Sequence, residues 1–197
     1  MALMAAVAAI GGEEERSDAI AAARAGDLAA FELLMRQHER LVLATALRLT
    51  GNMADAQDVS QDVFLRLYRN LGKVKAAEAL PAWLYRVTVN ACHDLRRRRP
   101  ASEPESSAGD LVDGGIDPQT ALTQAERRRI LEMSLRILPE KERAALVLRD
   151  LEGLSTQEVA RALGSSEATV RSQVSKARAK VHDFVERYFS PRKRRES

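Results

Sequence analysis

One stretch near the C-terminus, "SSEATVRSQVSKAR", combines hydroxyl and basic side chains at helical spacing. Val170, Val174 and Ala177 recur at that spacing and are expected to face a core. The opposite arc of the helix then carries Arg171, Ser172, Ser175, Lys176 and Arg178. An arginine can pair bidentately with guanine, and serine or lysine can contact bases or phosphates. The chemistry that this arc favours is therefore the recognition of nucleic acid.

The residues before this stretch predict how the helix is positioned. Ser155 followed by Glu158 is typical of a capping box at the start of a short helix. Gly164 permits a sharp turn, and Ser166 can cap the second helix. Two helices joined in this way are typical of a helix-turn-helix, whose second helix enters the DNA major groove. The alternative is an ordinary solvated helix face. This interpretation is less favoured because the stretch from Arg161 to Arg195 contains ten basic residues and three acids.

Charge and composition divide the chain into two modules. From Arg86 to Arg99 there are five arginines and one acid, and from Pro100 to Pro118 there are five acids and no base. The stretch 100–119 is rich in Pro, Gly, Ser and acids, and it is expected to be a flexible acidic linker. Aromatic residues are 4% of the 197 residues, and Ala, Leu, Arg and Glu dominate, which favours helices. We expect an all-α fold of two small helical domains, 27–99 and 120–189, the second with the helix-turn-helix. An extension with a short helix over 1–26 and a basic tail over 190–197 complete the chain.

The second helix of the front module, "NMADAQDVSQDVFLRLYRNLG", presents an acidic and apolar outer face. If Val59 points inward, Val63 and Leu67 share its stripe. The far side then holds Asp58, Gln61, Asp62 and Leu65. Acids repel phosphates, whereas an apolar centre with a charged rim is typical of a protein-docking surface. A solvated face with no partner is the alternative.

The third helix of the front module, "LPAWLYRVTVNACHDLRRRR", carries aromatic and basic residues together. Its predicted buried stripe is Leu80, Leu84, Val87, Ala91 and Leu95. The side chains that point elsewhere are Tyr85, Arg86, Val89, Asn90, His93, Arg96 and Arg97. Aromatics among arginines suit single-stranded nucleic acid, because bases stack on rings and phosphates meet cations. Trp83, at the flank of the stripe, is better explained as a core residue.

Other chemistry is not indicated. The one cysteine, Cys92, excludes an internal disulfide and a thiolate zinc cluster. The three histidines lie far apart without metal-ligand spacing, so we expect no metal and no cofactor. Cys92, His93 and Asp94 are adjacent, and neighbouring side chains on a helix point about 100° apart, so they cannot act as a nucleophile and base. We expect no enzyme activity, no membrane insertion and a cytoplasmic location.

Several motifs in order resemble those of bacterial RNA polymerase sigma factors of the sigma-70 family, extracytoplasmic function (ECF) group. "LTGNMADAQDVSQDVFLRLYRNL" resembles region 2.2, and "LPAWLYRVTVNACHDLRRRR" resembles regions 2.3 and 2.4. "LPEKERAALVLRDLEGLSTQEVARALGSSEATVRSQVSKARAKV" resembles region 4. The resemblance implies an activity in transcription initiation, with promoter recognition and melting. A helix-turn-helix regulator that does not bind core polymerase is the alternative.

The resemblance also implies partners and residue roles. The partners would be core RNA polymerase (the β′ clamp helices and the β flap), promoter DNA and an anti-sigma factor. The residues implied for docking on core polymerase are Asp55, Asp58, Gln61, Asp62 and Leu65. Those implied for the −10 element are Lys73, Lys75, Arg86, Asn90, Arg96 and Arg97. Those implied for the −35 element are Thr169, Arg171, Ser172, Ser175, Lys176 and Arg178. Ser165 departs from the family, since an apolar residue is common at its place in the turn.

Overall fold

The part of the chain that the structure describes is built from helices. The computed structural model describes residues 18–74, 79–98 and 123–190, and no strand occurs within these ranges. The linker over 100–119, the first seventeen residues of the N-terminal extension and all but Ser190 of the basic tail lie outside them. The predictions of flexibility for these segments remain predictions, whereas the all-α fold is confirmed.

The front module contains three long helices. A helical segment over 18–24 precedes α2 (Leu28–Thr50), which is followed by α3 (Met53–Asn70), the 3₁₀ turn η1 (Leu71–Lys73) and α4 (Ala79–Arg98). Asp27 caps α2, since its carboxylate accepts hydrogen bonds from the backbone N–H groups of Ala29 and Ala30 at 2.8 and 3.1 Å. Gly51 ends α2 in the left-handed region at φ 82°, which a glycine adopts without strain.

The back module contains four helices and one irregular turn. In chain order they are α5 (Gln124–Arg136), α6 (Glu140–Leu146), the π-helical turn η2 (Val147–Leu151), α7 (Thr156–Leu163) and α8 (Glu167–Phe189). The wider turn is closed by the backbone N–H of Glu152, which donates to the carbonyl of Val147 at 2.9 Å. A π turn shifts the register of the residues that follow it, and hydrophobic periodicity does not reveal such a turn.

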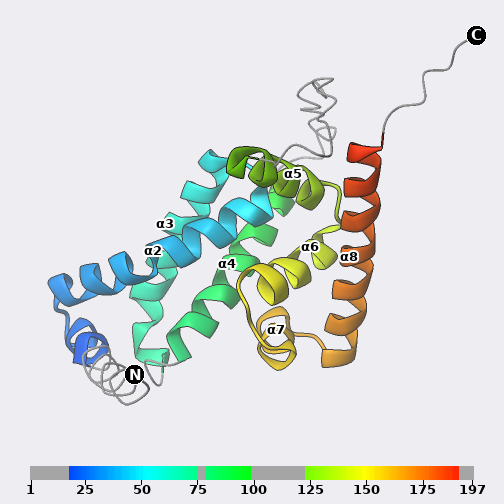
Figure 1. Ribbon diagram of the computed structural model, residues 1–197. Coiled ribbons are helices and arrows are strands. Elements are labelled where there is room, and N and C mark those ends of the chain that lie inside the picture. Colours follow the sequence, from blue (N-terminus) through cyan, green and yellow to red (C-terminus); the bar gives the residue numbers. More distant parts are fainter. Residues whose placement is uncertain (1–17, 75–78, 99–122, 191–197) are drawn as a thin grey trace, which may run out of the picture.

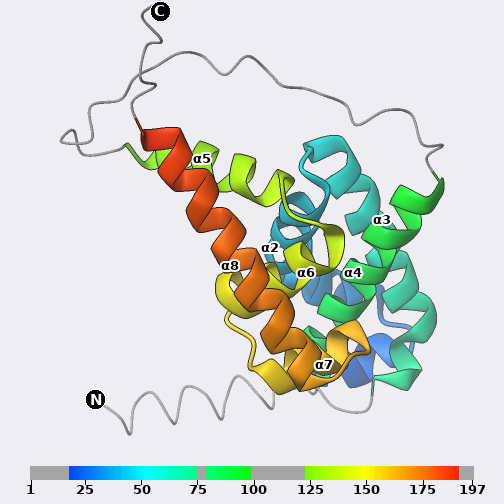
Figure 2. The same ribbon diagram turned by 90° about the vertical axis from the view of Figure 1, so that its right-hand side faces the viewer.

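The two modules lie side by side and share one hydrophobic core. Figures 1 and 2 show α6 and α7 between α4 of the front module and the long helix α8. The buried cluster runs through both modules and includes Val42, Leu84, Leu148, Val159 and Val170. The three front helices pack on one another within it. The outer faces of α3 and α8 remain exposed to solvent and are available for binding.

Candidate nucleic-acid and protein-docking surfaces

The predicted helix-turn-helix is present and capped as expected. The hydroxyl of Ser155 accepts from the N–H of Glu158 at 3.2 Å, and the carboxylate of Glu158 accepts from the N–H of Ser155 at 2.8 Å. Hydrogen bonds to its carboxylate from the side chain and from the backbone N–H of Ser155 lower the pKa of Glu158. Gly164 makes the turn at φ 60°, and Ser166 caps α8 by accepting from the N–H of Thr169 at 3.1 Å. Each cap satisfies backbone donors that would otherwise lack a partner.

The inner and outer faces of α8 are divided as the spacing predicts. Val170, Val174 and Ala177 are buried against the rest of the back module. The six residues implied for the −35 element are all exposed, namely Thr169, Arg171, Ser172, Ser175, Lys176 and Arg178. The structure therefore places them together on one solvent-facing surface, which we call the α8 outer face.

A shallow hollow of about 300 Å³ adjoins the α8 outer face. Its polar lining includes Arg171, Ser175 and Arg178 from α8, with Arg149 and Thr156 from the preceding turn and helix. Arg149 is held by a hydrogen bond from its guanidinium to the carbonyl of Leu154 at 3.0 Å. Sequence analysis missed Arg149 and Thr156, because the π turn obscures which face Arg149 occupies. Three guanidinium groups around one concave site favour an anion such as a phosphate.

Two arginines of the α8 outer face already have acidic neighbours. The Arg178 guanidinium donates to both carboxylate oxygens of Asp150, at 2.8 and 2.7 Å. Arg171 makes a single contact with Glu167, one turn earlier on α8, at 3.2 Å. Arg178 is therefore fixed in place by a residue of the π turn, whereas Arg171 is held more loosely.

The residues implied for the −10 element lie mostly on one face of α4. Arg86, Asn90 and Arg97 are exposed and fall within about 40° of one another around the helix. Arg96 is exposed but lies about 100° away, toward Arg143 of α6, whose pKa is lowered by burial and then by the charge of Arg96. Lys73 is exposed in η1, and Lys75 lies outside the described residues. Trp83 is partly buried and packs against the core, in agreement with the core interpretation.

The acidic and apolar face of α3 is open to solvent. Asp58, Gln61 and Leu65 are exposed, and Leu65 shows 54% of its surface. Asp62 is half-buried and pairs with Arg66 at 2.7 Å. Tyr68 extends this face, since it is 52% exposed and stands edge-on to Phe31 of α2, with ring centroids 5.1 Å apart. Sequence analysis left Tyr68 out of the docking face, although its spacing from Leu65 placed it one turn further along.

Asp55 differs from the other residues implied for docking. It is 5% exposed, and its carboxylate accepts from the side-chain amide of Asn52 at 2.7 Å. The amide oxygen of Asn52 in turn accepts from the N–H of Asp55 at 2.8 Å. This reciprocal pair closes the first turn of α3, so the Asp55 carboxylate serves the helix end. We therefore leave it out of the α3 docking face, which is Asp58, Gln61, Asp62, Leu65 and Tyr68.

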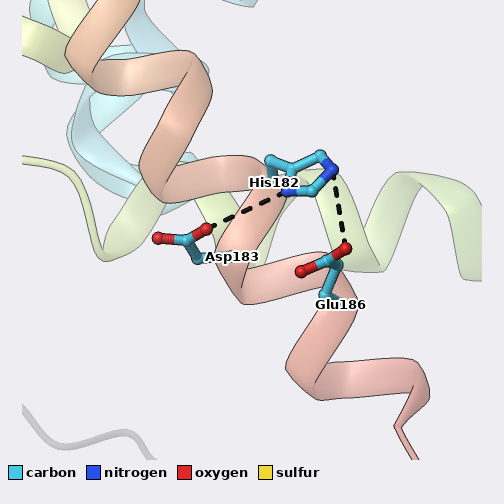
Figure 3. A group of neighbouring side chains, drawn as sticks. All are labelled: His182, Asp183 and Glu186. Carbon is cyan, nitrogen blue, oxygen red and sulfur yellow. Dashed lines mark ion pairs between the residues drawn. The ribbon is translucent and has the colours of Figure 1, made fainter.

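One group of side chains has the residue types of a metal site. His182, Asp183 and Glu186 lie together on α8 (Figure 3), with His182 nitrogens 3.9 Å from Asp183 and 3.7 Å from Glu186. All three are exposed and belong to a single helix. Sequence analysis considered only the histidine spacing and overlooked this trio. Exposed acids near a histidine are common on helices, and none of the three surfaces above includes this group.

No helix in the described ranges is long and apolar enough to cross a lipid bilayer.

Known families match both modules. The chain matches the family Sigma-70 region 2 over residues 34–101 and the family Sigma-70, region 4 over residues 128–181. It is 38% identical over 173 residues to the ECF RNA polymerase sigma factor SigM of Mycobacterium tuberculosis, covering 87% of this chain and 86% of that protein. It is 32% identical over 171 residues to the ECF RNA polymerase sigma-E factor of Escherichia coli strain K12, covering 82% and 89%.

Solved structures are similar over most of the fold. CnrH, in complex with the cytosolic domain of CnrY, has a TM-score of 0.64 at 28% identity, covering 88% of this chain and 98% of that one. The sigma factor RpoE from Bartonella quintana, in complex with the anti-sigma factor NepR, has a TM-score of 0.59 at 25% identity, covering 77% and 96%. Two matched regions in this order on an all-helical fold define the sigma-70 class. The chain belongs to the extracytoplasmic function group of the sigma-70 family, as its motifs indicate.

Proposed function

We propose that this chain is an ECF sigma factor that binds core RNA polymerase, recognises −35 and −10 promoter elements and directs transcription initiation. The observation that carries the proposal is the presence, in one chain, of a helix-turn-helix with a basic outer face and an acidic, apolar face on α3. A simple DNA-binding regulator needs the first surface but has no use for the second. Family membership supports the same assignment.

The α8 outer face is proposed to lie in the major groove of the −35 element. Arg171 is free enough to reach a base edge, where its planar guanidinium suits guanine. Arg178, Arg149 and Thr156 surround the hollow and suit a backbone phosphate, which fixes the register of the helix on the duplex. Lys176 keeps a positive charge but lacks the bidentate geometry of arginine, so we assign it to phosphate contact.

The exposed face of α4 is proposed to hold the −10 element. Arg86, Asn90 and Arg97 share this face, and Lys73 precedes it along the chain. Unpairing a base costs a few kcal/mol, which contacts to the extruded base and its phosphates have to offset. Lys75 and Arg96 are also part of the proposal; Lys75 lies outside the described residues, and Arg96 points toward Arg143 of α6.

The α3 docking face is proposed to bind the β′ clamp helices of core polymerase, with the back module reaching the β flap. Leu65 and Tyr68 supply an apolar centre, and Asp58, Gln61 and Asp62 form a polar rim. An anti-sigma factor is a further proposed partner, since RpoE of Bartonella quintana is similar to this chain and was solved with one. We propose no catalytic role, and a protein acting on promoter DNA is expected in the bacterial cytoplasm.

Transcription in vitro tests the proposal directly. Purified core polymerase and this protein are incubated with a pool of random promoter sequences, and the transcribed templates are sequenced. We expect transcripts only when both components are present, from templates that share two short elements at a fixed spacing. Transcripts in neither case, with no co-elution of the protein and core polymerase on gel filtration, would favour the regulator that does not bind polymerase.

A further inference from the structure

Glu152 connects the back module to two helices of the front module. It follows the π turn, and its side chain is 10% exposed. One carboxylate oxygen pairs with the guanidinium of Arg48 on α2, and the other accepts from the hydroxyl of Tyr85 on α4 at 3.2 Å. Burial, together with the charge of Glu152, raises the pKa of Tyr85, so the hydroxyl stays protonated and able to donate. A nearly buried carboxylate with two partners on different helices is costly to separate from them.

Other polar contacts close the same interface at the end of α2. Arg143 of α6 is 6% exposed and donates to the carbonyl of Leu49 at 2.9 Å. Arg136 of α5 donates to the carbonyl of Gly51 at 2.8 Å. These carbonyls belong to the C-terminal end of α2, where the helix dipole favours positive charge. On α4, His93 lies 3.0 Å from Glu140 of α6.

The interface also buries a second apolar face of α4. Tyr85, Val89 and Cys92 are each at most 8% exposed, although they lie about 80–180° around the helix from Leu80 and Leu84 of the predicted stripe. Glu152 reaches Tyr85, and α7 packs against α4. Burial, with Glu140 and Asp55 nearby, raises the pKa of Cys92 to about 12. Tyr85 is thus contacted from the back module by Glu152, and Cys92 lies near Glu140 of α6.

This closed arrangement is too small for a promoter. By the scaling of compact domains, a body of this size has a diameter of roughly 40 Å. Elements at −35 and −10 are about 25 base pairs apart, which is about 85 Å at the rise of a DNA duplex. The chain between Arg98 and Thr123 could extend over about 80 Å, so its length permits the modules to separate.

We propose that Glu152 fastens a closed, autoinhibited form of this chain, which must open before α4 and α8 can contact one promoter. The requirement to open rests on the proposed function, whereas the fastening role of Glu152 does not. The apparent affinity for a partner that needs the open form is reduced by the fraction of molecules that are open. Weakening the contacts of Glu152 should therefore increase activity, which is the reverse of the usual effect of losing a buried ion pair.

The single cysteine reports opening in the unmodified protein. Cys92 is buried near Glu140 of α6, and its reaction with Ellman's reagent at pH 8 requires exposure of the thiol. We expect Glu152→Gln to label about tenfold faster than wild type, and Tyr85→Phe, which keeps the ring, to label about threefold faster. Glu132→Gln, which loses only an exposed pair with Arg128 within α5, is the matched control and should label as wild type. Labelling of Glu152→Gln at the wild-type rate would overturn the proposal.

Low concentrations of urea separate opening from global unfolding. Opening exposes little surface, so labelling should respond weakly to urea, whereas labelling through global unfolding would rise with the full slope of the unfolding transition. The full slope in every variant would mean that no separate open form exists and would overturn the proposal.

Transcription gives the functional half of the test. On a promoter recovered from the random pool, Glu152→Gln should need about tenfold less protein for half-maximal transcription, with the same maximum. Faster labelling with an unchanged half-maximal concentration would overturn the requirement to open. A wild type that yields no transcript would overturn the proposed function and that requirement together, while labelling would still decide whether Glu152 fastens the modules.

Discussion

Asp150 holds Arg178 of the recognition helix through two parallel hydrogen bonds, at 2.7 and 2.8 Å. Asp150 lies in the π turn, two residues before Glu152. This short segment therefore contacts α8 through Asp150 and the front module through Glu152. The pair is exposed on the arginine side, at 62%, and so stabilises the fold by less than about 1 kcal/mol. Its consequence for DNA binding should be larger than its consequence for folding.

Asp150→Asn should strengthen binding to DNA of any sequence. The change removes a negative charge beside the proposed phosphate site and releases Arg178 from its partner. We expect tighter binding to scrambled duplexes and a steeper dependence on salt, by about one counterion, measured by fluorescence anisotropy between low and high salt. Cognate binding should gain less, so the ratio of specific to non-specific affinity should fall. An unchanged salt slope would place Arg178 outside the DNA interface.

Arg171→Ala should reduce binding to the −35 element selectively. If Arg171 reads a base, its loss should cost about 1–3 kcal/mol on the cognate duplex and much less on a scrambled one. Arg128→Ala removes an exposed arginine of α5 that is not part of the α8 outer face, and it should change neither affinity. Equal losses by Arg171→Ala on both duplexes would reassign this side chain to the phosphate backbone.

Two neighbouring serines should respond to alanine with opposite signs. The hydroxyl of Ser165 is buried, and no partner for it occurs in the part of the chain that the structure describes. Ser165→Ala should therefore leave the free energy of unfolding unchanged or raise it by up to about 1 kcal/mol. Ser166 caps α8, so Ser166→Ala should lower it by about 1 kcal/mol. Urea unfolding of both variants checks this, and equal losses would mean that the Ser165 hydroxyl has a partner after all.

Leu65→Gln should weaken binding to core polymerase without affecting the fold. Leu65 is 54% exposed, so its replacement leaves no cavity, but it removes the apolar centre of the α3 docking face. We expect a loss of about 1–2 kcal/mol in affinity, measured by fluorescence titration with core polymerase. Ile137→Gln changes a leucine-sized side chain that is 45% exposed at the end of α5, and it serves as the control. Unchanged affinity for Leu65→Gln would exclude this face from docking.

Much of the fold could be predicted because capping residues mark the ends of several helices and hydrophobic spacing marks their buried sides. Ser155 and Ser166 each cap the helix that the sequence assigned to them, and Gly164 makes the turn that was expected of it. These features depend on residues three or four positions apart, so the sequence contains all that is needed to find them.

The features that were missed depend on packing between distant segments. Periodicity assigns one buried face to a helix, but α4 has two: Tyr85 and Val89 are also buried, and Glu152 of the back module contacts Tyr85. Asp55 had the right residue type for docking, yet the first turn of α3 uses it as a cap partner for Asn52. The π turn that aims Asp150 and Glu152 in different directions leaves no pattern of its own in the sequence.

Alkaline pH should destabilise the protein in a way that depends on Cys92. Burial raises the pKa of its thiol to about 12 in the folded chain, above the ordinary value near 8.5 that applies when the chain is unfolded. The stabilisation from keeping the thiol neutral is therefore complete below about pH 8.5 and is lost as the pH rises from there towards 12, at up to about 1.4 kcal/mol per pH unit. Cys92→Ala removes the titrating group, so its free energy of unfolding should fall less between pH 8.5 and 10 than that of the wild type. Urea unfolding at pH 7.5, 8.5, 9.3 and 10 gives the two profiles, and parallel profiles would mean that the thiol does not titrate differently in the folded and unfolded chain.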